Sequence, residues 1–215
     1  MDLTWLGHGC FRLRGRGAAV VTDPFPPSLG LKLPRLEANL VTVSHDHPNH
    51  SYLQAVPKAG YVVDGPGEYE VGGVTVTGLQ TYHDASRGTE RGANTVFLIE
   101  LDDVKVCHLG DLGHSLVDEQ VEVLAGLDVL LVPVGGRHGL DAAQAAEVVR
   151  QLEPRLVVPM HFKIPGVKLE LEPVGRFLKE MGVTVAEPQP KLSVQASSAE
   201  PGETKLVLLE PRVAP

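Results

Sequence analysis

Three histidines lie within six residues, in the segment His45-Asp46-His47-Pro48-Asn49-His50. The segment follows an apolar, β-branched run over residues 39–44, a composition typical of a buried strand. If the chain continues extended, the first two imidazoles point to the same side, and a turn at the proline brings the third back. Neutral imidazole is a good zinc ligand, and a site needs three or four donors converging at about 2 Å. The segment therefore predicts a metal site, and the alternative is a solvated loop with coincidental histidines.

Three further candidate ligands each follow a predicted strand: His83, Asp111 and His161. Those strands are expected over residues 74–79, 104–109 and 155–160. Taken singly, each residue could equally have a structural role. Sites in layered α/β proteins assemble where strands leave the sheet, so the shared placement favours one common metal centre.

The surrounding sequence predicts the elements that must position these residues. Short β-type runs separated by Gly, Pro and Asp fill the first half, whereas the second half alternates strands with helices. Strands followed by helices in this order favour a layered α/β sandwich, formed as one domain over residues 1–215. The other predicted strands are 2–6, 10–13, 18–22, 61–63, 95–101, 128–134, 191–195 and 205–209, and the predicted helices are 117–125, 141–152 (with Asp141 as N-cap) and 173–181.

Composition narrows the function classes. The 19 basic and 27 acidic residues give a net charge of −8. Without a basic face, nucleic-acid binding is not expected, and no apolar run reaches the roughly 18–20 residues of a membrane span. Two cysteines make no disulfide framework, and the N-terminus resembles no signal peptide. We expect a cytoplasmic protein with a small-molecule substrate and leave its oligomeric state open.

With the segment 45–50 and the downstream His83, Asp111 and His161, the chain resembles the metallo-β-lactamase superfamily, whose signature is His-x-His-x-Asp-His followed by downstream His, Asp and His. It is most similar to the single-domain branch that includes ascorbate-6-phosphate lactonase-like proteins. The resemblance covers residues 1 to about 165 in order. Its motifs in this chain are Thr4-Trp5-Leu6-Gly7-His8, Asp23-Pro24, Gly110-Asp111 and Pro159-Met160-His161.

The resemblance implies a four-layer αββα sandwich with a two-metal site at one edge of the paired sheets. One metal would be bound by His45, His47 and His83. The second would be bound by His50 and His161, with Asp111 bridging both. The implied enzyme is a metal-dependent hydrolase in which metal-bound hydroxide attacks an ester, lactone, amide or phosphoester. Asp111 and His50 are the expected catalytic residues.

One position departs from the family pattern. The Asp of the second metal corresponds to Asn49, whose neutral amide is a weaker ligand for a divalent ion than a carboxylate. The site would then bind one or two ions, with zinc or manganese expected. Asn49 itself is an uncertain ligand, and Asp84 is a further carboxylate that could supply the missing charge.

Other polar residues have expected roles around this centre. His8, His114 and His138 lie on glycine-rich loops, which often carry substrate contacts. Asp23 is expected to orient a ligand rather than bind metal, and His108 to be a hydrogen-bonded strand residue.

Three rival functions remain open at the level of the sequence. The first is a degenerate member that binds metal without catalysis, which Asn49 favours. The second is a di-iron oxidoreductase, which usually needs a carboxylate at the position of His47. The third is nucleic-acid processing, which in this superfamily usually comes with an inserted domain.

Overall fold

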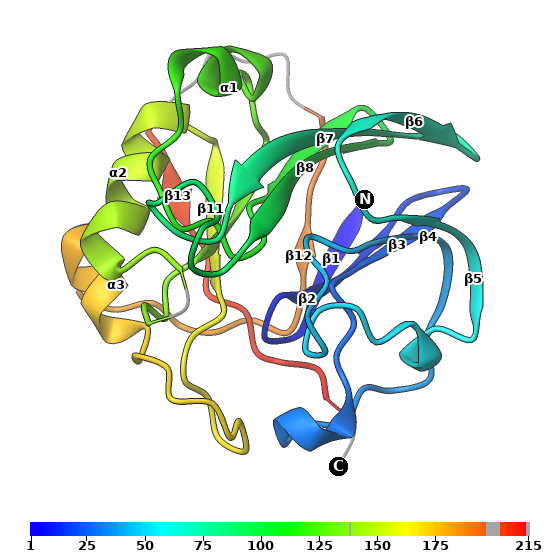
Figure 1. Cartoon of the computed structure of the whole chain (residues 1–215), viewed down its shortest axis with the longest axis horizontal. Coiled ribbons are helices and arrows are strands. Elements are labelled where there is room, and N and C mark those ends of the chain that lie inside the picture. The colour runs from blue at the N-terminus through cyan, green and yellow to red at the C-terminus, as the bar shows by residue number, and fades with distance from the viewer. Residues whose placement is uncertain (138, 197–202, 214–215) are drawn as a thin grey trace.

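Two β-sheets pack face to face in the computed structural model, which describes residues 1–137, 139–196 and 203–213 (Figure 1). The first sheet has the strand order β12-β1-β2-β3-β4-β5, and the second has the order β13-β11-β10-β9-β8-β7-β6. The first sheet contains β1 (Asp2–Gly7), β2 (Cys10–Arg14), β3 (Ala19–Thr22), β4 (Glu37–Thr42), β5 (Lys58–Val63) and β12 (Leu192–Ser193). The second contains β6 (Gly67–Val71), β7 (Val74–Tyr82), β8 (Ala93–Leu101), β9 (Val104–His108), β10 (Val129–Pro133), β11 (Leu156–Met160) and β13 (Lys205–Leu206).

Both sheets are mixed. In the first, β1, β2 and β3 are antiparallel neighbours, whereas β3, β4 and β5 run parallel. In the second, β6 to β9 are antiparallel, and β9, β10, β11 and β13 run parallel. The carboxyl ends of the parallel strands β9, β10 and β11 therefore meet at one edge, where a site can form.

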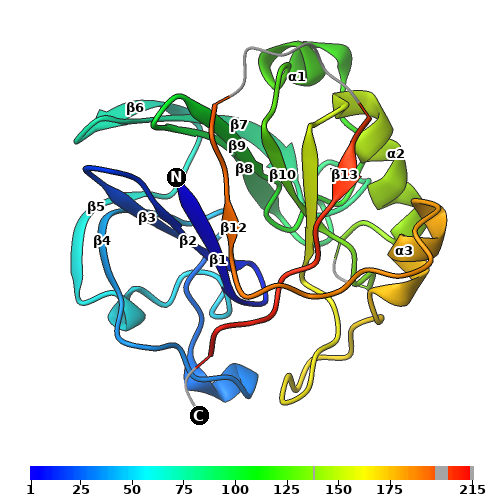
Figure 2. The same ribbon diagram turned by 180° about the vertical axis from the view of Figure 1, so that it is seen from behind.

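The α-helices of the described residues lie beside the second sheet. They are α1 (Asp118–Val123), α2 (Ala142–Leu152) and α3 (Gly175–Glu180). In both views α2 and α3 lie next to β11 and β13 (Figures 1 and 2). On the first sheet, the connections instead include the short 3-10 turns Pro27–Leu29 and Leu53–Ala55. The predicted α/β sandwich is confirmed.

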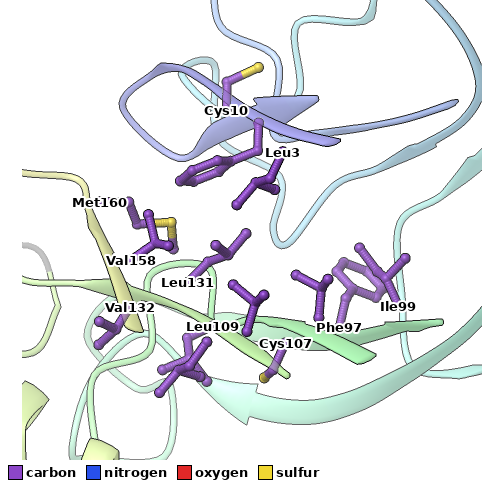
Figure 3. Close-up of a cluster of buried hydrophobic side chains, with 14 of the residues drawn as sticks. Leu3, Cys10, Phe97, Ile99, Cys107, Leu109, Leu131, Val132, Val158 and Met160 are labelled. Atoms are coloured by element: carbon purple, nitrogen blue, oxygen red, sulfur yellow. The ribbon is translucent and has the colours of Figure 1, made fainter. Parts of the chain in front are cut away.

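The core lies between the sheets. Leu3 of β1 and Leu131 of β10 are fully buried and point toward one another across the interface (Figure 3). Every residue of β10 is buried, because this strand is central in its sheet and covered on both faces. That position explains why the run over residues 129–133 is continuously apolar rather than alternating.

Helix α2 begins where the sequence predicts. The side chain of Asp141 accepts from the backbone N–H of Gln144, whose side chain accepts in return from the backbone N–H of Asp141. This reciprocal capping box satisfies two otherwise unpaired donors and is typically worth about 1 kcal/mol. The helix buries the face that contains Ala145, Val148 and Val149.

Two differences from the predicted elements concern sheet edges. The C-terminal strands β12 and β13 are only two residues long, and each adds to the edge of a different sheet, β12 beside β1 and β13 beside β11. Strand β6 was not predicted, because its residues are mostly half-buried or exposed and the run is rich in glutamate. The Gly72-Gly73 pair that joins it to β7 is the turn signal that would have found it. Among the described helices, none has the length and apolarity needed to cross a membrane.

Candidate metal centre

The predicted ligands, together with His8, which was predicted to contact substrate, lie at one rim of the sandwich, each just beyond the end of a strand. His8 follows β1, His83 follows β7, and His161 follows β11. Asp111 follows β9, and the segment 45–50 follows β4. The strands place these side chains at a common point although they are up to 153 residues apart in the chain.

Asp111 is the centre of this cluster. Its Oδ2 atom lies 3.2 Å from Nε2 of His83, and 3.3 Å from Nε2 of both His50 and His161. Nε2 of His45 lies 4.0 Å from the same oxygen. Four imidazole nitrogens therefore surround one carboxylate oxygen, an arrangement suited to sharing a cation.

Two buried atoms in the cluster support a cation rather than a closed hydrogen-bond network. Nε2 of His45 and Oδ1 of Asp111 have no hydrogen-bond partner among the described residues. A buried polar atom without a partner costs about 1–3 kcal/mol, so such atoms need an explanation. A divalent cation bound to imidazoles and a carboxylate would supply it, because these are common zinc ligands. The residues present therefore fit a metal site.

Three groups of side chains bring their ligand atoms within 4.8 Å of one another. They are His45 with His83 and Asp111, His45 with His47 and His50, and His8 with His50 and His161. The cavity beside them has a volume of about 80 Å³. Its walls are formed by His8, His47, Asn49, His50, His83, Asp111, His161 and Leu169.

The backbone of the histidine segment differs from the extended geometry that the sequence suggested. The N–H of His47 donates to the carbonyl of His45 at 2.9 Å, and the N–H of His50 donates to that of His47 at 2.8 Å. These successive turns, rather than strand alternation, bring the three imidazoles together. The ring centroids of His45 and His50 are 4.4 Å apart, and that of His47 lies 5.8 Å from His45.

Asp23 orients two of the candidate ligands through hydrogen bonds, as expected for a residue that supports ligands and does not itself bind metal. Its Oδ2 atom accepts from Nδ1 of His50 at 2.9 Å and from Oγ of Ser44 at 2.6 Å. Because this hydroxyl donates to Asp23, it accepts from Nδ1 of His45 at 2.9 Å. Both imidazoles are thereby held with Nδ1 protonated and Nε2 directed at Asp111, the orientation that metal-binding histidines require.

A second network fixes Asp111. Oδ1 of Asn94 accepts from the backbone N–H of Asp111 at 3.0 Å, and the Asn94 amide donates to the carbonyl of Leu109. Gly110 has φ +58°, and a Cβ there would lie 2.4 Å from Oδ1 of Asn94. Only glycine therefore fits this turn without displacing its neighbours.

His108 is a structural residue, as the sequence indicates. It is fully buried, its Nε2 donates to the carbonyl of Gly9, and its Nδ1 accepts from the N–H of Gly110. It thus joins the turn after β1 to the turn that carries Asp111.

The charges of the side chains in the site follow from burial and from the two carboxylates. Burial, and then the neighbouring His50, lower the pKa of His45 to about 4. Burial also disfavours the charged form of His50, but Asp111 and Asp23 outweigh it and raise the pKa of His50 to about 10. Burial would raise the pKa of Asp111, yet His161 and His50 hold it well below its usual range. At neutral pH the site therefore contains a carboxylate, a protonated His50 and a neutral His45.

The three residues expected to contact substrate have different surroundings. His8 is buried among the candidate ligands, and its Nε2 lies 3.1 Å from Nε2 of His50. His114 accepts from the N–H of Tyr82 and donates to the carbonyl of Ser115, so neither ring nitrogen is left for a substrate. We therefore now interpret His114 as a structural residue. His138 lies outside the described residues.

Two uncertain positions are also placed. Asn49 is half-buried and lines the cavity. Asp84 does not supply charge to the metal centre, contrary to the sequence-based suggestion. Its two oxygens accept four backbone N–H groups in the loop after β7, from Ser86, Gly88, Glu90 and Arg91. These bonds lower the pKa of Asp84, although burial opposes them.

Ser44 and Asn94 are positioning residues that the sequence analysis missed. Ser44 directly precedes the histidines, so its position was itself a signal. Asn94 is completely buried in β8, and asparagine is disfavoured in strands, which makes a polar network the natural explanation.

Comparison with known proteins places this site in a family. The model of the β-lactamase superfamily domain matches residues 2–161. A UPF0173 protein from Pyrococcus furiosus is 32% identical over 203 residues, which cover 84% of this chain and 90% of that protein. A UPF0173 metal-dependent hydrolase from Methanoculleus marisnigri is 30% identical over 228 residues, which cover 94% of this chain and all of that protein.

Solved structures agree in fold. A metallo-β-lactamase superfamily protein from Thermotoga maritima superposes with a TM-score of 0.78 at 40% identity, over 97% of both chains. A metallo hydrolase from Ignicoccus hospitalis has a TM-score of 0.66 at 20% identity, over 90% of this chain and 99% of that one, and shows the fold alone. The chain therefore belongs to the β-lactamase superfamily, as a hydrolase with curated relatives that include several named metal-dependent hydrolases.

Proposed function

We propose that the cluster around Asp111 binds one or two divalent cations and that the protein hydrolyses an ester, lactone, amide or phosphoester of a small molecule. The observation that carries the proposal is the position of Oδ2 of Asp111, 3.2–3.3 Å from three imidazole Nε2 atoms and 4.0 Å from a fourth. A mixed imidazole and carboxylate set suits zinc, and manganese is the alternative. The Thermotoga maritima relative is itself described as a candidate Zn-dependent hydrolase.

The family resemblance implies two sets of ligands that share Asp111. His45, His47 and His83 would bind one cation, and His50 and His161 would bind the other. A bound divalent cation lowers the pKa of water from 15.7 to about 7 and polarises a carbonyl or phosphoryl oxygen.

The protein contributes orientation and proton transfer. The carboxylate of Asp111 lies at the centre of the candidate ligands, so it would orient the attacking water and accept its proton. Asp23 holds His50 at 2.9 Å and keeps its Nε2 directed into the cluster. His50 therefore positions the reacting centre, and Asp111 is the expected general base.

The cavity restricts what enters. With a volume of about 80 Å³, the cavity is far smaller than the roughly 300–1,000 Å³ typical of a pocket that encloses a whole drug-sized ligand. The bond to be cleaved would enter it, and the rest of a larger substrate would lie outside. The exposed ring of His47 stands on the cavity wall, so it lies where the substrate would pass. A small molecule is therefore the proposed partner, and two buried free cysteines support the cytoplasm as its compartment.

A second candidate function is metal binding without catalysis. Asn49 favours it, because a neutral amide on the cavity wall leaves the site with one carboxylate, that of Asp111, among its wall residues. Hydrolase assays of the wild-type protein and of Asn49→Asp, each with measured metal content, distinguish the two functions.

The test combines elemental analysis with a substrate panel. The purified protein is stripped with chelator, reloaded with Zn²⁺ or Mn²⁺, and assayed against lactones, phosphodiesters and thioesters. We expect hydrolysis of at least one class that disappears on stripping and returns on reloading. Asp111→Asn should lose this activity and keep a wild-type circular dichroism spectrum. Metal-independent hydrolysis, or full activity of Asp111→Asn, would contradict the proposal.

A further inference from the structure

His8 has surroundings that a substrate-contacting loop residue would not have. Only 1% of its surface is exposed, and it lines the same cavity as the candidate ligands. Its ring centroid is 4.1 Å from that of His161 and 4.7 Å from that of His50. Its Nε2 lies 3.1 Å from Nε2 of His50.

The distance between these two nitrogens matches shared coordination. Two donors bound to one zinc ion at about 2.0–2.1 Å and at a tetrahedral angle lie roughly 3.3 Å apart. Nδ1 of His50 already donates to Asp23, so its Nε2 is the nitrogen left to face a cation. His8, His50 and His161 form a group whose ligand atoms all lie within 4.8 Å.

The backbone holds His8 in place at a conformational cost. Its φ is +54°, in the left-handed region that residues with a Cβ rarely adopt. The carbonyl of His8 accepts from Nε1 of Trp5 at 3.0 Å and from the N–H of His161 at 3.2 Å. Asp23 and His161 also have positive φ, +39° and +53°. Strained residues that cluster around one point are typical of a functional site.

We propose that His8 is a metal ligand, which completes the second cation position together with His50, His161 and Asp111. The imidazole of His8 would replace the carboxylate ligand that the family pattern has at position 49. This exchange is possible because His8 and Asn49 both lie on the wall of the same cavity. Three imidazoles and one carboxylate make a complete four-donor set for zinc. This inference rests on the proposed metal-dependent function, and it assigns His8 to the metal rather than to the substrate.

The test measures metal binding, with no need for a substrate. His8→Asn is the informative variant, because asparagine tolerates the left-handed backbone better than most residues and removes the imidazole. Zn²⁺ titration by calorimetry and metal content after dialysis are compared for wild type, His8→Asn, and the control His114→Asn. We expect His8→Asn to lower the affinity for one of the bound zinc ions by more than about 100-fold. Loss of a residue that only supports a ligand typically lowers metal affinity by about 10–100-fold, so a larger loss indicates a ligand. The control should bind zinc as the wild type does.

A double variant tests the exchange of ligands. His8→Asn combined with Asn49→Asp should recover zinc affinity, because the carboxylate then replaces the lost imidazole. Wild-type zinc affinity and stoichiometry in His8→Asn, with wild-type circular dichroism, would overturn the assignment and leave the proposed hydrolase intact. Absence of zinc and manganese binding to the wild-type protein would instead refute the proposed function together with this inference.

Discussion

The substitution Asp23→Asn tests whether one buried carboxylate orients two metal ligands. Asp23 is fully buried and accepts from the N–H of Ser44 at 2.8 Å, from the Ser44 hydroxyl at 2.6 Å, and from Nδ1 of His50 at 2.9 Å. An asparagine has one acceptor and one donor in place of two acceptors. If its amide group faces His50, Nδ1 must become the acceptor and Nε2 carries the proton, so His50 can no longer bind a cation through Nε2.

The alternative amide orientation is also unfavourable, because the NH₂ group then faces the donating N–H of Ser44. Removing such a supporting carboxylate typically lowers metal affinity 10–100-fold. That loss corresponds to about 1.4–2.7 kcal/mol. The loss should be at the upper end, since the hydroxyl of Ser44 also holds His45 at 2.9 Å.

The assay is Zn²⁺ titration of chelator-stripped protein, with a competing chelator where binding is tight. Asp128→Asn is the matched control, because Asp128 is a buried carboxylate that accepts from the N–H of Lys105 and pairs with Arg155, away from the metal centre. The control should lower the free energy of unfolding and leave zinc affinity unchanged. Equal zinc affinity in Asp23→Asn and wild type would refute the orienting role of Asp23.

Three further predictions concern the turn, the protons and the cavity wall. Gly110→Ala should lower the free energy of unfolding about 1–3 kcal/mol more than Gly72→Ala, measured by urea denaturation. The two glycines have similar φ angles, +58° and +59°, but of the two only Gly110 lacks room for a Cβ. Equal losses of unfolding free energy in the two variants would therefore argue against the close approach of Gly110 to Asn94. Zn²⁺ binding at pH 7 should release about one proton, because the pKa of His50 is raised to about 10 and the imidazole stays protonated until a cation binds. For the same reason the affinity for Zn²⁺ should fall as the pH falls. Calorimetry in two buffers of different ionisation enthalpy measures this release, and a value of zero would count against it. Lys163→Ala should raise KM by up to about tenfold with kcat unchanged, because Nζ of Lys163 donates to the carbonyls of Val167 and Leu169, and Leu169 lines the cavity. Lys179→Ala on α3 is the surface control, and a lower kcat at unchanged KM in Lys163→Ala would contradict this role.

The sequence predicts the ligands well because their placement follows from strand ends. His83, Asp111 and His161 each come just after a strand, and strands that run in the same direction and end at one edge of a sheet must bring such residues together. The buried strand β10 and the capped helix α2 were predicted for the same reason, since local pattern and tertiary environment agree there.

Local pattern fails where long-range contacts decide. The turns within residues 45–50 depend on backbone hydrogen bonds that an alternation argument does not contain. His8 lies on a glycine-rich turn typical of a surface loop, yet β1 ends against His161 and buries it. Asp84 looks like a ligand in the sequence because it adjoins His83, but the loop folds back on its carboxylate.

The central claim, that Asp111 and the surrounding imidazoles hold a divalent cation, is tested most directly by anomalous diffraction from crystals grown with Zn²⁺. We expect a peak about 2.0–2.2 Å from Asp111 and from Nε2 of His45 and His83. Well-ordered crystals at saturating zinc with no peak between these side chains would contradict the account.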